Sequence, residues 1–155
     1  MQPERLEEAS RGTTKAPMDI LIYGYGIMAG AMVDGWLRAG MNPRSITAYN
    51  PRPKPVAEGV RLVTELPDRA FDAVVLGFKP YMLANIAPSM ESVVRGGIVL
   101  SVLAGVELDT LEKRLPAAGG WVRFMPNLAV ALGKSPNALV ERGLDEEGRD
   151  AVTRL

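Results

Sequence analysis

Short apolar runs alternate along this chain with segments in which apolar residues recur every three or four positions. Residues 28–39 show the helical pattern most clearly, because apolar side chains recur at Met28, Met32 and Trp36 while charged residues fall on the other face. The complete pattern predicts strands at residues 19–23, 45–49, 60–63, 71–78, 98–102, 121–124 and 137–141. It predicts helices at residues 28–39, 80–94 (with a break or kink at Pro88), 108–115 and from residue 145 onward.

The order of these elements indicates the fold class. The run at residues 71–78 (FDAVVLGF) is apolar at almost every position, as expected of a strand buried on both faces of a parallel sheet. Strands that alternate with helices predict an α/β protein with a doubly wound, Rossmann-type, mostly parallel sheet and helices on both faces. Such sheets bind ligands at the carboxyl ends of their strands, so the residues that follow each strand are the candidates for a functional site.

Composition narrows the chemistry that this chain can perform. Its 155 residues suit one domain, and they include 18 Lys+Arg, 18 Asp+Glu, no Cys and no His. Without thiols and imidazoles there can be no disulfide, no cysteine nucleophile and no histidine-based triad, and we predict no metal site. A net charge of zero argues against a nucleic-acid interface. The longest apolar stretch, residues 96–106, is shorter than the ~18–20 residues of a membrane span.

The first 17 residues differ from the rest of the chain. They are polar and show no apolar period, so we interpret residues 1–17 as a disordered leader. The apolar core of a secretory signal is missing from them, and we therefore expect a cytoplasmic protein.

The first predicted strand leads directly into a glycine-rich segment, GYGIMA at residues 24–29, which opens the first helix. The segment has the form G-x-G-x-x-A. In this form Gly24 permits a tight turn, Gly26 lets a pyrophosphate approach the backbone, and Ala29 lets the helix pack closely on the strand. A chance glycine-rich turn is the alternative, but the strand before it and the amphipathic helix after it favour a dinucleotide site.

The end of the second predicted strand bears on which dinucleotide is bound. An NAD site normally has an acidic residue there, which accepts hydrogen bonds from the ribose hydroxyls. This chain has Asn50 at that point, followed by Arg52 and Lys54. A guanidinium would bind a 2′-phosphate that a carboxylate would repel, so we predict NADP(H), with NADPH preferred over NADH. A solvated basic turn without a ligand is the alternative.

These segments, with three others, resemble a known family. The run GYGIMAGAMVDGWL is similar to the opening of pyrroline-5-carboxylate reductases, which carry G-x-G-x-M-A at the first turn. The three further stretches are VVLGFKP at residues 74–80, SVLAGV at residues 101–106 and RFMPN at residues 123–127, in the order and spacing of that family. The resemblance extends from about residue 18 to residue 155.

The resemblance implies a reaction and a set of cofactor contacts. These enzymes reduce the cyclic imine 1-pyrroline-5-carboxylate to L-proline with a nicotinamide hydride. A protonated imine is already electrophilic, so the protein mainly positions the reactants, and we assign no catalytic side chain. The implied contacts are Gly24, Tyr25, Gly26, Ile27, Met28 and Ala29 at the pyrophosphate, Asn50 and Arg52 at the adenosine ribose and its phosphate, Gly77, Phe78, Lys79 and Pro80 beside the nicotinamide half, Ala104 and Gly105 at the fifth strand end, and Asn127 near the nicotinamide and the substrate.

Several of these positions also have a purely structural interpretation. Lys79 could be a solvated surface lysine, and Pro80 could serve only to start a helix. We expect the side chains of Tyr25 and Met28 to pack rather than take part in chemistry. Ser101 has no base near it in the sequence, so a packed hydroxyl is expected there rather than a nucleophile.

Two departures from the family pattern concern the substrate side. The family continues Met-Pro-Asn with Thr-Pro, whereas this chain has Leu128 and Ala129. The family also adds a helical dimerisation domain after the nucleotide domain. We therefore expect residues 18–142 to form the dinucleotide-binding domain and residues 143–155 to begin a helical region that is otherwise absent, so that a homo-oligomer requires the missing part.

Three alternatives remain open. The chain could be a truncated or non-catalytic NADP-binding module, a relative of hydroxyisobutyrate dehydrogenases, or a relative of F420-dependent NADP reductases.

Overall fold

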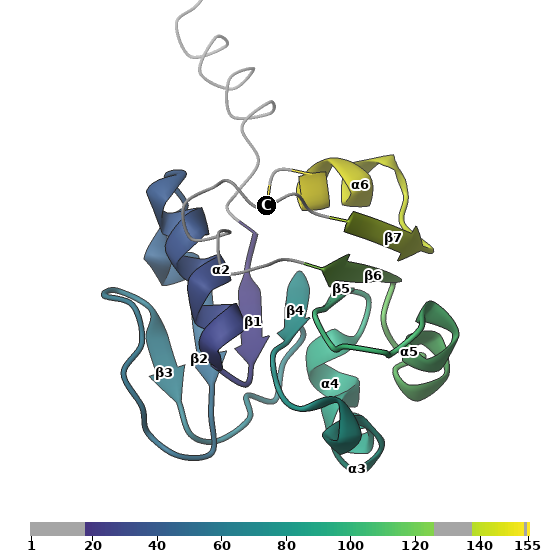
Figure 1. Cartoon of the computed structure of the whole chain (residues 1–155), viewed down its shortest axis with the longest axis horizontal. Coiled ribbons are helices and arrows are strands. Elements are labelled where there is room, and N and C mark those ends of the chain that lie inside the picture. Colours follow the sequence, from purple (N-terminus) through teal and green to yellow (C-terminus); the bar gives the residue numbers. More distant parts are fainter. Residues whose placement is uncertain (1–17, 126–137, 154) are drawn as a thin grey trace, which may run out of the picture.

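A seven-stranded sheet forms the centre of the protein, with strand order β3-β2-β1-β4-β5-β6-β7 (Figure 1). The computed structural model describes residues 18–125, 138–153 and 155. β1 to β6 are parallel to their neighbours, and β7 runs antiparallel to β6. The strands are β1 (Ile20–Tyr23), β2 (Ile46–Tyr49), β3 (Arg61–Val63), β4 (Ala73–Leu76), β5 (Ile98–Ser101), β6 (Gly120–Met125) and β7 (Ala138–Arg142). The predicted doubly wound, mostly parallel sheet is thus confirmed.

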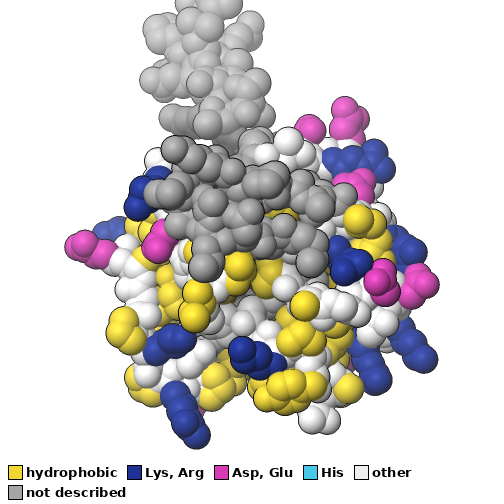
Figure 2. Space-filling view, viewed as in Figure 1, with side chains coloured by type: hydrophobic (Ala, Val, Ile, Leu, Met, Phe, Trp, Pro, Cys, Tyr) yellow, Lys and Arg dark blue, Asp and Glu magenta, His cyan; other side chains and the backbone are white. Residues whose placement is uncertain are grey.

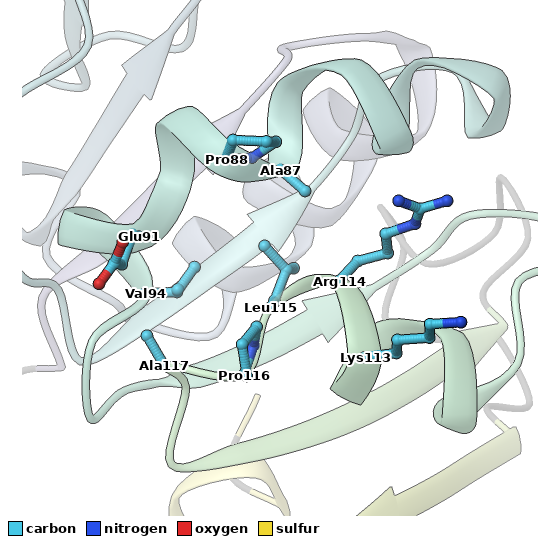
Figure 3. Close-up of a pocket in the computed structure, with 9 residues that line it drawn as sticks. All are labelled: Ala87, Pro88, Glu91, Val94, Lys113, Arg114, Leu115, Pro116 and Ala117. Atoms are coloured by element: carbon cyan, nitrogen blue, oxygen red, sulfur yellow. The ribbon is translucent and has the colours of Figure 1, made fainter.

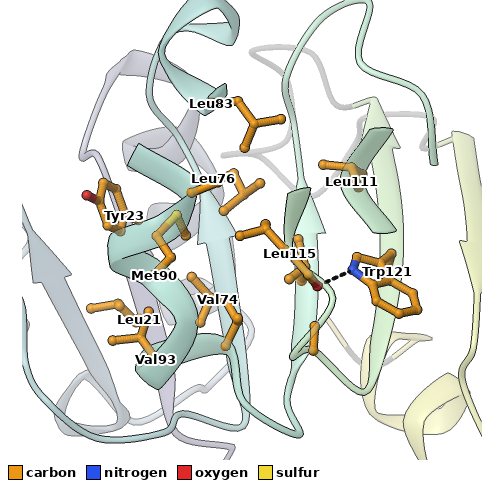
Figure 4. Close-up of a cluster of buried hydrophobic side chains, with 14 of the residues drawn as sticks. Leu21, Tyr23, Val74, Leu76, Leu83, Met90, Val93, Leu111, Leu115 and Trp121 are labelled. Atoms are coloured by element: carbon orange, nitrogen blue, oxygen red, sulfur yellow. Dashed lines mark hydrogen bonds between the residues drawn. The ribbon is translucent and has the colours of Figure 1, made fainter. Parts of the chain in front are cut away.

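Helices cover both faces of the sheet. Successive side chains of each strand point to opposite faces, and apolar side chains on each face pack against helices. On β1, Ile20 and Ile22 pack with α2 (Ile27–Arg38) and with Val152 of α6 (Glu146–Thr153). Leu21 and Tyr23 pack on the other face, with α3 (Leu83–Ile86), α4 (Glu91–Val94) and α5 (Leu108–Arg114) (Figure 4). Each central strand is therefore buried on both sides, which explains its continuous apolar sequence.

The connection between β4 and β5 differs from the single helix predicted at residues 80–94. It consists of η2 (Pro80–Met82), α3, η3 (Ala87–Met90) and α4, so the helix is interrupted more than once. Pro88 lies inside η3, where its missing N–H and its ring prevent a regular α-helical turn. The predicted break is confirmed.

β4 is shorter than the strand predicted at residues 71–78. Phe71 is buried and its N–H donates to the Val93 carbonyl, but it lies before the paired part of the strand. At the other end the chain leaves the sheet at Gly77, where it meets the loop after β1. Apolar residues therefore continue past the paired residues of β4 at both ends of the strand.

The last helix packs on the face of the sheet that α2 covers. The N–H of Gly148 donates to Oδ1 of Asp145 at 2.7 Å, which caps the start of α6. Val152 is buried, and Nε1 of Trp36 in α2 donates to the Leu155 carbonyl at 2.9 Å. That residues 143–155 begin a separate helical region stays a prediction, and the expected leader at residues 1–17 lies outside the described residues. Within the part of the chain that the structure describes, no helix is long and apolar enough to cross a membrane.

Candidate functional site

The parallel strands end in one row across the sheet. The last residue of β1, Tyr23, is paired with Tyr49 of β2 and with Leu76 of β4. Leu76 is paired in turn with Ser101 of β5, which is paired with Arg123 of β6. The segments that follow these residues therefore emerge along the same edge. Most of the predicted site residues come together there, namely residues 24–29, 50–52, 77–80 and 104–105, whereas Asn127 lies outside the described residues.

Two glycines bring the loops after β1 and β4 into direct contact. A Cβ on Gly77 would lie 2.2 Å from the carbonyl oxygen of Gly24 and 3.0 Å from Cβ of Ala29. Gly24 has a φ of +93°, and a Cβ there would lie 2.9 Å from the Phe78 nitrogen. The N–H of Gly24 donates to the Tyr49 carbonyl and that of Gly77 to the Tyr23 carbonyl. Neither position can carry a side chain without moving backbone.

The N-terminus of α2 faces this edge without a side-chain cap. Gly26 is the N-cap residue in an extended conformation, no side chain bonds to the first turn, and that turn contains no acidic residue. Ile27, the first helical residue, is 83% exposed. A Cβ on Gly26 would meet its nearest atom, the Gly77 oxygen, only at 3.4 Å. The first-turn N–H groups, which lack partners within the helix, are therefore available to an anion.

The other residues of the glycine-rich loop face inward. Ala29 is 1% exposed, which permits the close contact with Gly77. The Tyr25 ring is buried, its hydroxyl accepts a hydrogen bond from the Ala57 N–H at 3.3 Å, and burial raises its pKa. Met28 is partly buried against the same core cluster. The expected packing of the Tyr25 and Met28 side chains is confirmed, while pyrophosphate contact by this loop stays a prediction.

The segment after β2, residues 50–57, is called the basic turn here. The backbone N–H of Asn50 donates to the Val63 carbonyl, and its Nδ2 donates to the Arg52 carbonyl at 2.7 Å, which folds the start of the turn. Arg52 and Lys54 are exposed, and neither has an ion-pair partner among the described side chains. Lys and Arg side chains mark the lower edge of Figure 2, where β1, β2 and β3 end. Two cations without an acidic partner among the described residues therefore lie beside the glycine-rich loop.

An aromatic group lies behind these loops. The Tyr23 ring packs edge-on against Tyr49 and Phe78, with ring centres 4.8 and 5.4 Å apart. Burial also raises the pKa of Tyr23. The Phe78 ring thus packs, partly buried, against the core cluster, and both its backbone and its exposed part lie at the edge. The sequence reasoning did not single out Tyr23 and Tyr49, although aromatic residues at the ends of two neighbouring strands were a visible signal.

Farther along the edge, Ser101 and Arg123 each make a hydrogen bond within the protein, although Nε of Arg123 is buried without a partner among the described residues. Ser101 is 1% exposed, and its Oγ accepts a hydrogen bond from the Leu103 N–H at 3.2 Å, so it is the packed hydroxyl that was expected. Nη1 of Arg123 donates to Glu107 at 3.0 Å, which ties β6 to the loop that contains Ala104 and Gly105. The sequence reasoning used Arg123 only as part of a motif. A lone arginine inside an apolar strand was the signal that could have found this ion pair.

The remaining predicted residues at the end of β4 are accessible. Lys79 is exposed, and its carbonyl accepts the Met82 N–H at 2.9 Å. Pro80 starts η2, which is the structural role considered for it. Neither observation tests contact with a ligand, so cofactor binding by Lys79 and Pro80 stays a prediction.

A separate groove of about 550 Å³ lies between η3–α4 and the end of α5 (Figure 3). Val94 and Leu115 are among its apolar lining residues, and Lys113 and Arg114 lie at its rim. Both helices lead from here into the starts of the next strands, so the groove lies toward the amino ends of the strands. It is distinct from the edge where the glycine-rich loop lies.

A parallel sheet of this strand order, with an uncapped helix N-terminus after the first strand, defines the class of Rossmann-type dinucleotide-binding domains. The chain belongs to the family described as NADP oxidoreductase, coenzyme F420-dependent, which matches residues 19–105.

Curated relatives agree with the resemblance seen in the sequence, which is confirmed. Pyrroline-5-carboxylate reductase from Pasteurella multocida (strain Pm70) is 31% identical over 131 residues, which are 77% of this chain and 48% of that protein. The same enzyme from Methanosarcina acetivorans is 30% identical over 75% of this chain and 46% of that protein. The chain thus spans about half the length of the curated relatives it matches.

Solved structures share the fold. A pyrroline-5-carboxylate reductase from Coxiella burnetii superposes with a TM-score of 0.75 at 22% identity, covering 88% of this chain and 54% of that one. The Plasmodium falciparum enzyme with NADP bound has a TM-score of 0.71 at 20% identity, covering 87% of this chain and 52% of that one. A putative F420-dependent NADP reductase from Arthrobacter sp. FB24 has a TM-score of 0.62 at 15% identity, covering 88% of this chain and 78% of that one.

Proposed function

We propose that this chain binds NADP(H) along the carboxyl edge of its sheet. The observation that carries the proposal is the uncapped N-terminus of α2, held against the end of β4 by the contact between Gly24 and Gly77. The pyrophosphate would lie on the first-turn N–H groups of α2, which offer partial positive charge and unpaired donors. The nicotinamide half would extend past residues 77–80 toward residues 104–105 and Asn127.

We further propose a preference for NADPH over NADH. Asn50 stands where a carboxylate would hold the ribose hydroxyls, and its side-chain N–H is already bonded to the Arg52 carbonyl. Arg52 and Lys54 are exposed and have no described acidic partner, so they can both turn to a 2′-phosphate. Charge-assisted hydrogen bonds of this kind are about twice as strong as neutral ones.

The reaction we propose is reduction of the cyclic imine 1-pyrroline-5-carboxylate to L-proline. Bound NADPH supplies a hydride at the nicotinamide C4. The chain's own part is to hold the cofactor in place, because an imine that is already protonated needs no side-chain acid. The proposal draws on the named relatives, of whose length this chain spans about half, and on the sequence motifs shared with them.

A second candidate is transfer of a hydride between NADP(H) and coenzyme F420. Two observations favour it, namely the family that matches residues 19–105 and the putative reductase from Arthrobacter, of which this chain covers 78%. That share is larger than the 54% covered of the Coxiella enzyme.

Cofactor titration and turnover together test these proposals. Calorimetry of the 155-residue chain should show tighter binding of NADPH than of NADH, and absence of binding to either would refute the proposed site. Turnover of 1-pyrroline-5-carboxylate should be slow in this chain, because orientation of a substrate accounts for ~7–11 kcal/mol of a bimolecular barrier. Fast oxidation of NADPH with oxidised coenzyme F420 as the acceptor would instead select the second candidate.

A further inference from the structure

One hydrogen bond joins the two parts of the proposed cofactor site. The Tyr25 hydroxyl, in the second position of the glycine-rich loop, accepts the N–H of Ala57 at 3.3 Å. Ala57 is the last residue of the basic turn, 32 residues farther along the chain. The bond therefore connects the loop that would bind the pyrophosphate to the turn that would bind the 2′-phosphate.

The returning limb of the basic turn is anchored only at its end, where Val56 and Ala57 pack partly buried against the core cluster and the Ala57 carbonyl accepts the N–H of Val60. Pro51, Pro53 and Pro55 have no N–H to donate, and residues 51–55 are all exposed. The start of the turn is held by the two hydrogen bonds of Asn50. Among the hydrogen bonds of the described residues, that of Ala57 alone ties the returning limb to the glycine-rich loop.

The accepting oxygen is itself held in place. The Tyr25 ring is 7% exposed and packs in the core cluster beneath α2. A Cβ on Gly30 of α2 would lie 3.4 Å from Cε1 of the ring, so the ring lies directly against the helix backbone. The position of the hydroxyl is consequently set by the same helix whose N-terminus would bind the pyrophosphate.

We propose that Tyr25 is a positioning residue for cofactor selectivity. Its hydroxyl holds the returning limb of the basic turn, so that Arg52 and Lys54 meet a 2′-phosphate at a set distance from the pyrophosphate loop. The inference rests on the proposed binding of NADP(H), and it goes beyond that proposal by assigning selectivity to a buried residue that need not touch the 2′-phosphate. Loss of the hydroxyl should therefore weaken NADPH binding and leave NADH binding unaffected.

The test is Tyr25→Phe, which removes one oxygen and keeps the ring. By titration of the 155-residue chain, NADPH affinity should fall about 2- to 10-fold, and NADH affinity should change less than about 2-fold. Hydrogen exchange should show faster exchange of the Ala57 amide. The matched control is Tyr23→Phe, at a residue that is 8% exposed but packs on the other face of the sheet, and this variant should keep the wild-type ratio of affinities.

Two results would overturn the inference. One is an unchanged ratio of NADPH to NADH affinity in Tyr25→Phe, and the other is an equal loss for both cofactors, which would indicate a merely structural role. Arg52→Asp separates the two proposals: if it removes the NADPH preference while Tyr25→Phe does not, the proposed function stands and the role of Tyr25 is refuted. If the wild-type chain binds neither cofactor, the proposed function fails too, whatever the Ala57 amide shows.

Discussion

The glycine-rich loop and the basic turn lie side by side at the edge of the sheet, yet they are built in opposite ways. The loop after β1 is packed backbone against backbone, with an added Cβ on Gly77 only 2.2 Å from the Gly24 oxygen. The basic turn is exposed along residues 51–55, and its cations have no described acidic partner. In the proposed site, anion binding by the loop would thus follow from the packed backbone, whereas the choice between cofactors would depend on the exposed side chains of the basic turn. The two properties should be separable by mutation.

Gly77→Ala should have the largest effect, and it should act on folding. The new Cβ would collide with the Gly24 backbone, so we expect a loss of about 3 kcal/mol in the free energy of unfolding, measured by chemical denaturation. The control is Gly26→Ala, where the nearest atom to the new Cβ lies at 3.4 Å and the loss should be only that of a less favourable N-cap, about 1 kcal/mol. Wild-type stability in Gly77→Ala would show that the glycine-rich loop is loosely packed.

Gly26→Val should abolish cofactor binding while the chain stays folded. The added side chain would occupy the space proposed for the pyrophosphate, and the cost of valine at an N-cap is about 1 kcal/mol. Calorimetry should show no binding of NADPH or NADH, and circular dichroism should show a native spectrum. Normal NADPH binding by this variant would mean that the phosphate site lies elsewhere.

Arg52→Asp should change selectivity without affecting the fold. Loss of a charge-assisted contact, with a carboxylate placed near the 2′-phosphate, should lower NADPH affinity about tenfold or more and leave NADH affinity similar or higher. Titration with both cofactors measures the ratio. Arg44→Asp is the matched control, because Arg44 lies in η1 (Pro43–Ser45) before β2, at the opposite edge of the sheet, and it should keep the wild-type preference. The same shift in both variants would point to net charge rather than to the turn.

Ser101→Ala should have the smallest effect, with a small loss of stability and no marked change in cofactor binding. The variant leaves the Leu103 N–H without its acceptor, so we expect a loss of about 1 kcal/mol in stability by chemical denaturation. Affinities for both cofactors should stay within about twofold of the wild type, since the hydroxyl is buried and bonded to its own loop. A large loss of NADPH binding would place Ser101 in the site.

Most of the fold could be predicted from local sequence patterns. β1, β2, β5 and α2 were predicted to within about a residue at each end, because each is a compact apolar or helical-period run with a glycine or proline close to at least one end. The segment at residues 71–78 was predicted too long, since a buried residue such as Phe71 looks the same in a sequence whether or not it is paired in a sheet. The interrupted connection at residues 80–94 was foreseen only at Pro88.

The candidate site could be predicted only in part. The glycine pattern, the missing acidic residue at Asn50 and the nearby Arg52 were all visible in the chain, because each is a short segment with its own chemistry. For the ion pair of Arg123 with Glu107 and the aromatic contacts of Tyr23, the sequence showed the unusual residues but not their partners, since these contacts join residues on different strands and loops. The steric need for glycine at Gly77 was also hidden, because its neighbour Gly24 is 53 residues away.

The sequence by itself determined the strand and helix order, the class of sheet and the nature of the groups at each strand end, because periodicity and turn residues act over a few positions. Only the tertiary structure decided which of those groups meet. The parallel register aligns the ends of β1, β2, β4 and β5, and that alignment places Gly77 against Gly24 and Tyr25 against Ala57. The physical reason is that side-chain packing on both faces of the sheet selects a single register, and contacts between distant residues follow from it.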